Sequence, residues 1–256
     1  MISTDTLYIG IDPTSGNKEF GYAALDDNLN LIALEEADTE ELCKFLGRQE
    51  TVYLAVNAPA RVNHGLVKKK FEQENPTPRR KFHSVDIRMA EFALRERGII
   101  IAGTPSREEY CPAWMQLGFA LHRKLSEMNF ETYGESSAAC QVLETHPYAC
   151  FCVLAESIPL PKPTLEGRLQ RQLVLNDKGL RITDAMAFFE EITRFKLVRG
   201  NLPTELLYSP EQLDVLVAAY TAWLTANHPD EVSLVGDKNE GQLILPVKEL
   251  RETYKE

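Results

Sequence analysis

The amino-acid sequence predicts an α/β protein in which an antiparallel meander of three strands is followed by parallel strands, with helices flanking this mixed sheet. Three observations lead to this prediction. Short apolar runs separated by turn residues fill the first 34 positions, a helical segment then precedes another buried run, and most of the remaining chain has helical periodicity. At 256 residues the chain is near the upper limit for one hydrophobic core, so we expect a single domain over residues 1–256 with helical insertions.

The order of the first elements distinguishes between two α/β folds. The run LYIGID ends in Asp12 and is followed by Pro13 to Gly16, which is typical of a strand that enters a turn. Strand, strand, strand, helix, strand is the opening order of the ribonuclease H-like fold, and it fits poorly with a Rossmann unit, in which strands and helices alternate singly. The predicted elements are strands at 7–12, 20–25, 29–34 and 52–56 and a helix from Thr39, its N-cap, to about Gly47.

The remaining elements follow from proline positions and helical spacing. Residues 60–83 are polar, basic and marked by Pro76 and Pro78, so they are predicted to form a long loop. Beyond this loop, apolar residues recur at helical spacing in several segments. The predicted helices cover 84–97, 113–128, 147–156, 164–175, 183–198 and 209–227. A strand is predicted at 139–144, a buried strand or a strand-like entry at 99–102, and a hairpin-like piece at 232–245.

Composition limits the class of protein. The chain is 44% hydrophobic and 26% charged, which is ordinary for a globular protein. No apolar run approaches the roughly 20 residues that span a bilayer, and the N-terminus lacks the basic start and apolar stretch of a secretory signal. Five cysteines are an odd number and too sparse for a disulfide framework. We therefore expect a cytoplasmic protein with reduced thiols and no membrane partner.

Charge is distributed unevenly along the chain. The formal net charge is −10, but residues 61–81 carry seven basic residues against two acids, and residues 162–181 carry five against two. Basic segments on an acidic body predict a groove that binds the nucleic-acid backbone. The alternative is that the two segments are solvated loops without a ligand.

Three acids stand where strand or helix ends would expose them. Asp12 ends the first strand, Glu144 ends a late strand, and Asp214 lies in the first turns of the 209–227 helix. Mg²⁺ prefers hard oxygen ligands and completes its shell with water and phosphate, and two such ions can assist phosphodiester cleavage. A cluster of carboxylates would also repel itself without cations. We predict that these three residues are catalytic and bind Mg²⁺ (or Mn²⁺). The alternative, which their spacing alone leaves open, is that each is an ordinary surface acid.

Basic and imidazole side chains near these acids have two interpretations each. His146 is predicted to act as a general acid or to position a phosphate, although Pro147 also suits a helix start in which His146 bonds only to backbone. Lys162, Arg168 and Arg171 share one segment, and the two arginines are three residues apart on one helical face. This spacing suits a phosphate clamp or, alternatively, ion pairs with acids such as Glu166.

Seven short strings, spread over nearly the whole chain, resemble a known family in their order and spacing. The strings are IGID (9–12), LAVNAP (54–59), SVDIRMAE (84–91), VLETHP (142–147), KPTLEGRLQR (162–171), QLDVLVAAYTA (212–222) and GDKNEGQLILP (236–246). With them the chain resembles the domain of unknown function 429 family, which is described as predicted nucleases of ribonuclease H-like fold. The resemblance implies that Asp12, Glu144 and Asp214 are the family acids. It also implies a substrate site that draws on Asp86, Arg88, Lys162, Glu166, Arg168 and Arg171, with Glu240 as a further candidate.

Two positions depart from the family pattern. The family typically has AIDAP where this chain has Asn57 within AVNAP, and asparagine keeps an oxygen ligand but removes a negative charge. We expect Asn57 to contribute to the substrate site and metal affinity to be lower. The family also has a paired acid before the helical aspartate, where this chain has Glu211 after Ser209 and Pro210.

Three functions compete at this point. The first is a metal-dependent nuclease, or phosphodiesterase, that acts on nucleic acid. The second is a catalytically degenerate domain of the same fold that binds nucleic acid or protein, which Asn57 favours. The third is a sugar-kinase or actin-like phosphotransferase, because the segment Gly10 to Ser15 is similar to a phosphate loop, but no second glycine-rich loop accompanies it. The sequence does not predict an oligomeric state.

Overall fold

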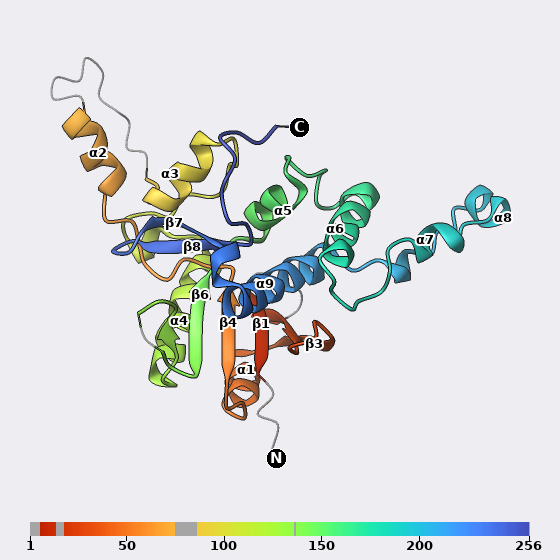
Figure 1. Ribbon diagram of the computed structural model, residues 1–256, viewed down its shortest axis with the longest axis horizontal. Helices are drawn as coiled ribbons and strands as arrows, with labels where there is room; N and C mark the ends of the chain where they lie inside the picture. The colour runs from red at the N-terminus through yellow and green to blue at the C-terminus, as the bar shows by residue number, and fades with distance from the viewer. Residues whose placement is uncertain (1–5, 14–17, 75–85, 136, 256) are drawn as a thin grey trace.

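The computed structural model, which describes residues 6–13, 18–74, 86–135 and 137–255, contains one eight-stranded mixed sheet (Figure 1). The strand order is β3-β2-β1-β4-β6-β8-β7, and β5 pairs with β6 beside this path. The first three strands are antiparallel, β1, β4, β6 and β8 are parallel, and β7 runs antiparallel to β8. The strands are β1 (Leu7–Asp12), β2 (Phe20–Leu25), β3 (Leu31–Ala37), β4 (Val52–Val56), β5 (Glu131–Thr132), β6 (Cys140–Glu144), β7 (Ser233–Asp237) and β8 (Gly241–Leu245).

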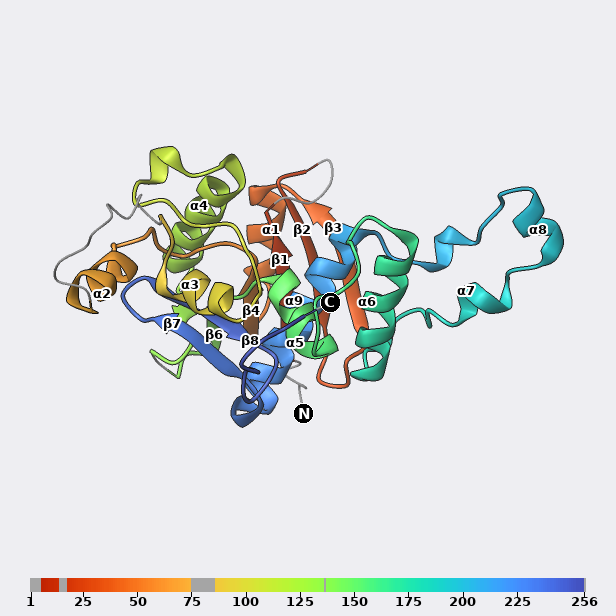
Figure 2. The ribbon, with the colours of Figure 1, turned by 90° about the horizontal axis from the view of Figure 1, so that it is seen from above.

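Helices cover both faces of this sheet (Figure 2). One face carries α1 and α4, and the other carries α9 with α3 and α5. No helix of the described residues has the length and apolarity needed to cross a bilayer. The helices are α1 (Thr39–Leu46), α2 (Leu66–Glu74), α3 (Met89–Glu96), α4 (Ala113–Glu127), α5 (Pro147–Ala155), α6 (Leu165–Asp177), α7 (Ala187–Glu190), α8 (Arg194–Val198) and α9 (Pro210–Asn227), with short 3₁₀ turns at Glu108–Tyr110, Thr204–Leu206 and Pro229–Glu231.

The central strands are buried on both faces, which is why they read as continuous apolar runs in the sequence. Along β1, Ile9 and Ile11 pack toward α1 and α4, whereas Tyr8 packs toward α9. This alternation follows from the two-residue period of a strand. The sheet therefore has two hydrophobic cores, one on each face.

Several predicted elements differ from the observed ones at their boundaries. The third strand begins at Leu31, because Leu29 adopts a positive φ of 59° in the preceding turn. Helix α1 is capped by Asp38, whose side chain accepts from Glu41 N, so Thr39 is the first helical residue. Helix α3 begins at Met89 rather than at 84. Within the predicted loop at 60–83, residues 66–74 form α2, and residues 75–83 lie outside the described part of the chain.

Of the two predictions for 99–102, the paired strand is wrong, because this segment pairs with no other strand among the described residues. Ile99 is buried and Ile100 is exposed, so the side chains alternate as in a strand. However, Ile99 N donates to Leu94 O and thereby closes the end of α3. Alternation of buried and exposed side chains predicts an extended backbone, but it does not show that another strand lies beside it to pair with.

The predicted helix at 183–198 is also wrong, because the structure has two short helices there, α7 and α8. Thr193 accepts a hydrogen bond from Lys196 N and so caps a second helix where the prediction continued the first. Residues 183–207, which we call the arm, project from the body of the molecule (Figures 1 and 2).

Candidate active site

Three parallel strands end side by side at one edge of the sheet, which we call the carboxyl edge. Ile11 of β1 pairs with Val56 of β4, and Val56 pairs with Glu144 of β6. Asp12 and Asn57 therefore lie next to each other, and Asn57 Nδ2 donates to Asp12 Oδ1 at 3.3 Å. The strand ends thus bring these two predicted site residues together.

Asp214 reaches the same edge from α9, which lies directly on β1. A Cβ added at Gly10 would stand 2.1 Å from Val215 O, so only glycine permits this close approach. Asp12 and Asp214 are both buried. Burial and, to a smaller extent, the negative charge of Asp12 raise the pKa of Asp214 to about 6, against the opposing charge of Lys162. The two acids therefore repel each other through a poorly solvated space.

Lys162 pairs with Asp214 at the solvent side of this space. Its ammonium group donates to Asp214 Oδ2, and the lysine side chain is 39% exposed whereas the aspartate side chain is 10% exposed. Lys162 precedes α6, where Thr164 caps the helix by accepting from Gly167 N at 3.0 Å. The cation is therefore held at the mouth of the site and remains accessible to a ligand.

Glu144 has a different environment. Both of its oxygens accept from the guanidinium of Arg88, and Ala60 N also donates to Oε2 at 3.0 Å. The side chains of Arg88 and Glu144 are only 2% and 4% exposed. Glu144 is therefore neutralised by a buried arginine.

Arg88 is held by a second carboxylate, which sequence reasoning did not single out. Its Nε donates to Glu91 Oε1 at 2.9 Å, and Thr104 also donates to Glu91. Although burial lowers it, the charges of Glu144 and Glu91 raise the pKa of Arg88 above its ordinary value. Glu91 stands three residues after Arg88, the spacing at which two side chains can meet along a helix, and this signal was available in the sequence.

His146 follows Glu144 and precedes Pro147, which occupies the first turn of α5 as predicted. Burial and, to a smaller extent, the charges of Lys162 and Arg88 lower the pKa of His146 to about 4, so the imidazole is neutral at pH 7. Among the described residues, its Nδ1 is buried and has no hydrogen-bond partner. His146 shares a small cavity of about 250 Å³ with Asn57, Arg88 and Glu144. A neutral imidazole can accept a proton there but cannot donate one as a general acid.

The two arginines predicted to clamp phosphate bond to the protein instead. Arg168 Nε donates to Tyr208 O at 2.8 Å, and its terminal nitrogen donates to Leu207 O. Arg171 is buried and donates to Leu160 O at 2.8 Å and to Gly167 O at 2.9 Å. Both guanidinium groups therefore satisfy backbone carbonyls around α6.

The other predicted substrate residues lie apart from the acid pair. Asp86 is exposed and accepts from Asn63 Nδ2 at 3.1 Å, and Glu166 lies in the first turn of α6. In the basic segment, Lys68 pairs with Glu72 at 3.8 Å on α2. Arg79, Arg80 and Lys81 lie outside the described residues.

Glu240 binds backbone rather than a ligand. Its fully buried carboxylate accepts from His64 N at 2.8 Å, Leu66 N at 3.1 Å and Met89 N at 2.9 Å. It therefore ties the start of α2 and the start of α3 to the β7–β8 turn. This arrangement supports the segment that carries Ala60 and Arg88 around Glu144.

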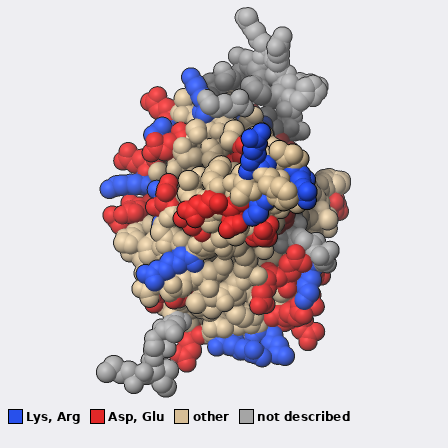
Figure 3. Space-filling view, turned by 90° about the vertical axis from the view of Figure 1, so that its right-hand side faces the viewer, with Lys and Arg blue, Asp and Glu red and all other residues tan. Residues whose placement is uncertain are grey.

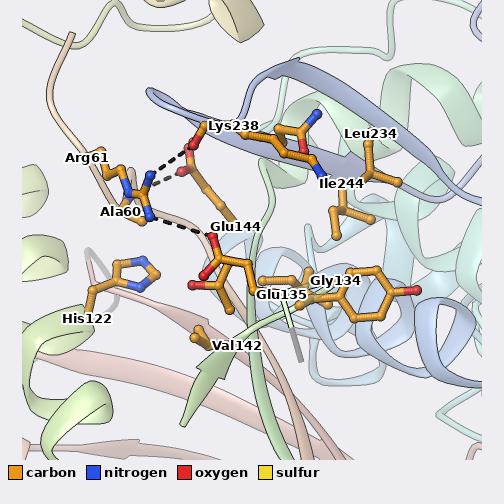
Figure 4. Close-up of a pocket in the computed structure, with 15 residues that line it drawn as sticks. Ala60, Arg61, His122, Gly134, Glu135, Val142, Glu144, Leu234, Lys238 and Ile244 are labelled. Atoms are coloured by element: carbon orange, nitrogen blue, oxygen red, sulfur yellow. Dashed lines mark hydrogen bonds and ion pairs between the residues drawn. The ribbon is translucent and has the colours of Figure 1, made fainter. Parts of the chain in front are cut away.

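An open cavity of about 810 Å³ lies on the other side of Glu144 (Figure 4). It forms because β6 and β8 pair only at Glu144 and Leu243. Arg61 points across the opening, where it donates to Lys238 O at 2.9 Å and approaches Glu135 at 3.7 Å. Glu144 lines this cavity, whereas Asp12 and Asp214 do not.

Within the described ranges, no group of three His, Cys, Asp or Glu side chains is arranged to hold a metal ion. The structure brings Asp12 and Asp214 together, whereas Glu144 faces Arg88. Metal binding by Asp12, Glu144 and Asp214 together therefore remains a prediction. Asp12 and Asp214 are the two members of this set that interact with each other.

The fold and these residues define an α/β protein with an acidic site at the carboxyl ends of its parallel strands. The chain belongs to the DUF429 family, described as a protein of unknown function, whose family model matches residues 10–240. The family resemblance seen in the seven strings is thus confirmed. No curated protein and no solved structure matches the chain.

Proposed function

We propose that this protein is a ribonuclease H-like, metal-dependent phosphodiesterase that cleaves nucleic acid. The strand order β3-β2-β1-β4-β6, with an antiparallel meander joined to parallel strands, supports this fold type. The observation that carries the function is the mutual approach of Asp12 and Asp214, which come from opposite ends of the chain and raise the local negative charge. Such a pair is stabilised by a cation.

The donor set fits Mg²⁺ or Mn²⁺. Asp12 and Asp214 supply hard oxygen ligands, and Mg²⁺ is commonly bound through one or two carboxylates, with water and substrate phosphate in its other positions. A metal ion held by Asp12 and Asp214 would act as a Lewis acid on a phosphodiester and stabilise its leaving oxygen.

Three further side chains, Asn57, Lys162 and His146, contribute to the proposed reaction. Asn57 orients Asp12 through its hydrogen bond, and it adds no charge. Lys162 is exposed enough to move from Asp214 to a phosphate oxygen of the substrate. His146 is neutral at pH 7, and its buried Nδ1, which has no partner among the described residues, would position the attacking water by accepting a hydrogen bond.

The test is cleavage of labelled single-stranded, branched and RNA–DNA substrates with Mg²⁺ or Mn²⁺. We expect Asp12→Asn and Asp214→Asn each to reduce the rate at least about a hundredfold. Asp230→Asn is the matched control, because Asp230 is exposed just beyond the opposite end of α9. Cleavage that survives both site substitutions would exclude the proposal.

A second candidate is a degenerate domain that binds nucleic acid or protein without cleaving it. Two ion pairs favour this candidate, one between Arg88 and Glu144 and one between Lys162 and Asp214. Because side chains of the protein already neutralise these two acids, the site has less need of a metal ion. Calorimetric titration with Mn²⁺ separates the candidates. Heat that disappears in Asp214→Asn supports the phosphodiesterase, whereas nucleic-acid binding without any Mn²⁺ heat supports the degenerate domain.

The sugar-kinase or actin-like alternative depends on a loop whose residues 14–17 lie outside the described part of the chain. A thermal-shift measurement with ATP remains its simplest check.

A further inference from the structure

The arm exposes an unusual amount of apolar surface. Five of the ten large hydrophobic side chains that are exposed among the described residues lie on it, and these five are between 48% and 79% exposed. A concentration of this kind marks an interaction site rather than scattered surface residues. The five residues are Met186, Phe189, Phe195, Leu197 and Val198.

Hydrogen bonds from α6 and a small apolar core hold the base of the arm in place. At its base, Gln172 of α6 donates to Thr183 O at 2.8 Å and to Leu206 O at 3.0 Å, so one side chain holds the outgoing and the returning segments. Arg168 binds the returning segment through the carbonyls of residues 207 and 208. A small core that includes Phe188 fills the base. The apolar side chains are therefore held away from the body by specific contacts.

The end of the arm is basic. Arg194, Lys196 and Arg199 lie in or directly after α8, between the exposed apolar residues. Lys196 pairs with Glu191 at 2.8 Å, and the Arg199 guanidinium lies 4.2 Å from the centre of the Phe195 ring. This surface combines apolar and cationic groups.

A complementary surface lies at the base of the arm. An open groove of about 670 Å³ is formed where β3 meets the start of α9, immediately after the arm returns to the body. Three carboxylates, Glu35, Glu36 and Glu211, line it together with Leu34 and Val215. Seen from the end of the arm, this side of the molecule carries separate groups of blue and red side chains on a tan surface (Figure 3).

We propose that a second copy of this chain covers the arm in a two-fold symmetric dimer. If two arms lie antiparallel, the basic apolar end of each reaches the acidic groove at the base of the other, so every contact is made twice. Charge complementarity between the arm end and the groove determines how the two copies align. The apolar side chains supply the surface area that is buried between them. Nucleic acid or an anionic membrane would meet the repelling carboxylates of the groove, whereas a second copy satisfies both surfaces together.

The first test is the mass of the protein in solution, measured by sedimentation and by light scattering on a sizing column. We expect a dimer, and we expect the double variant F195D/V198D to raise its dissociation constant about a hundredfold or more, because both symmetric contacts are affected. Ile100→Asp is the matched control, because Ile100 is equally exposed but lies outside the arm. The control should leave the dissociation constant unchanged.

A charge exchange tests the register. The variant R194E/R199E and the variant E35K/E211K should each be monomeric, because like charges then face each other at both contacts. Mixing the two should restore a dimer, since every contact in the mixed pair again joins opposite charges. A wild-type monomer at up to about 100 µM, or variants that remain dimeric, would overturn the proposal. A monomer whose arm binds vesicles or nucleic acid in an F195D-sensitive manner would also overturn it.

Discussion

Glu144 and Asp214 lie at the same edge of the sheet, and each pairs with a basic side chain, but the two pairs differ in their access to solvent. Arg88 and Glu144 are sealed in the interior, where Glu91 holds the other side of the guanidinium. Lys162, in contrast, is more than one-third exposed. A buried bidentate pair fixes structure, whereas an open lysine–carboxylate pair can exchange its partner for a ligand. Both carboxylates are buried, so the exposure of the basic partner distinguishes the two pairs.

The largest expected effect comes from breaking the buried pair. Arg88→Met leaves Glu144 and Glu91 without their cation, and we expect the free energy of unfolding to fall by about 3–5 kcal/mol. Lys162→Met is the comparison, with an expected loss of about 1 kcal/mol, because Asp214 can take up a proton when its partner is removed. Urea denaturation at pH 7 measures both. Equal losses in the two variants would contradict the distinction between the pairs.

The second prediction concerns the contact that brings Asp214 to Asp12. Gly10→Ala places a Cβ against the backbone of α9, and we expect it to cost about 2–3 kcal/mol and to move the helix away from β1. The pKa of Asp214 should then fall toward its ordinary value, because burial and the repulsion by Asp12 both decrease. Carbon-detected NMR titration measures this pKa. Gly47→Ala, at a helical φ of −67°, is the control and should leave it unchanged.

The third prediction uses pH to separate Asp214 from His146. The pKa of Asp214 is raised in the fold, so its contribution to stability is present below pH 3.8 and is lost as pH rises through about 6. The pKa of His146 is lowered, so its contribution is present above pH 6.5 and is lost as pH falls toward 4. Each amounts to up to about 3 kcal/mol, and the two offset each other in the wild type.

Single variants expose these opposing contributions. Relative to wild type, Asp214→Asn should become less stable as pH is lowered from 6 to 4, whereas His146→Gln should become more stable over the same range. Denaturation in the presence of a chelator measures both differences without divalent cations. Parallel pH profiles for the two variants would show that the assigned pKa directions are wrong.

Much of the site was predictable because it depends on strand ends and helix caps. Asp12 ends an apolar run, and Asp214 lies one turn after the cap at Ser209, so local patterns located both residues. Gly10 and its apolar neighbours marked β1 as a buried strand, although they did not show that α9 would lie on it. The meander and the parallel strands followed from the same patterns.

Other contacts were not predictable, because a local pattern of residue types does not specify which partner a side chain finds in the fold. Arg88 reaches Glu144 across 56 positions, and no local pattern distinguishes this pair from an exposed one. Arg168 and Arg171 have the spacing of a phosphate clamp, but nearby carbonyls from other segments satisfy them. The segment at 99–102 has strand-like alternation without a neighbour to pair with. Which partner each of these residues finds depends on which segments pack against it in the folded chain.

Glu240 has a consequence for how this chain tolerates change. The carboxylate of Glu240 accepts from the backbone at residues 64 and 66 and again at residue 89, so two positions far apart in the chain are fixed to one side chain. The entropy of closing a loop grows only slowly with its length. We therefore expect a change in the number of residues between these two contacts to leave the acids at the strand ends in their positions.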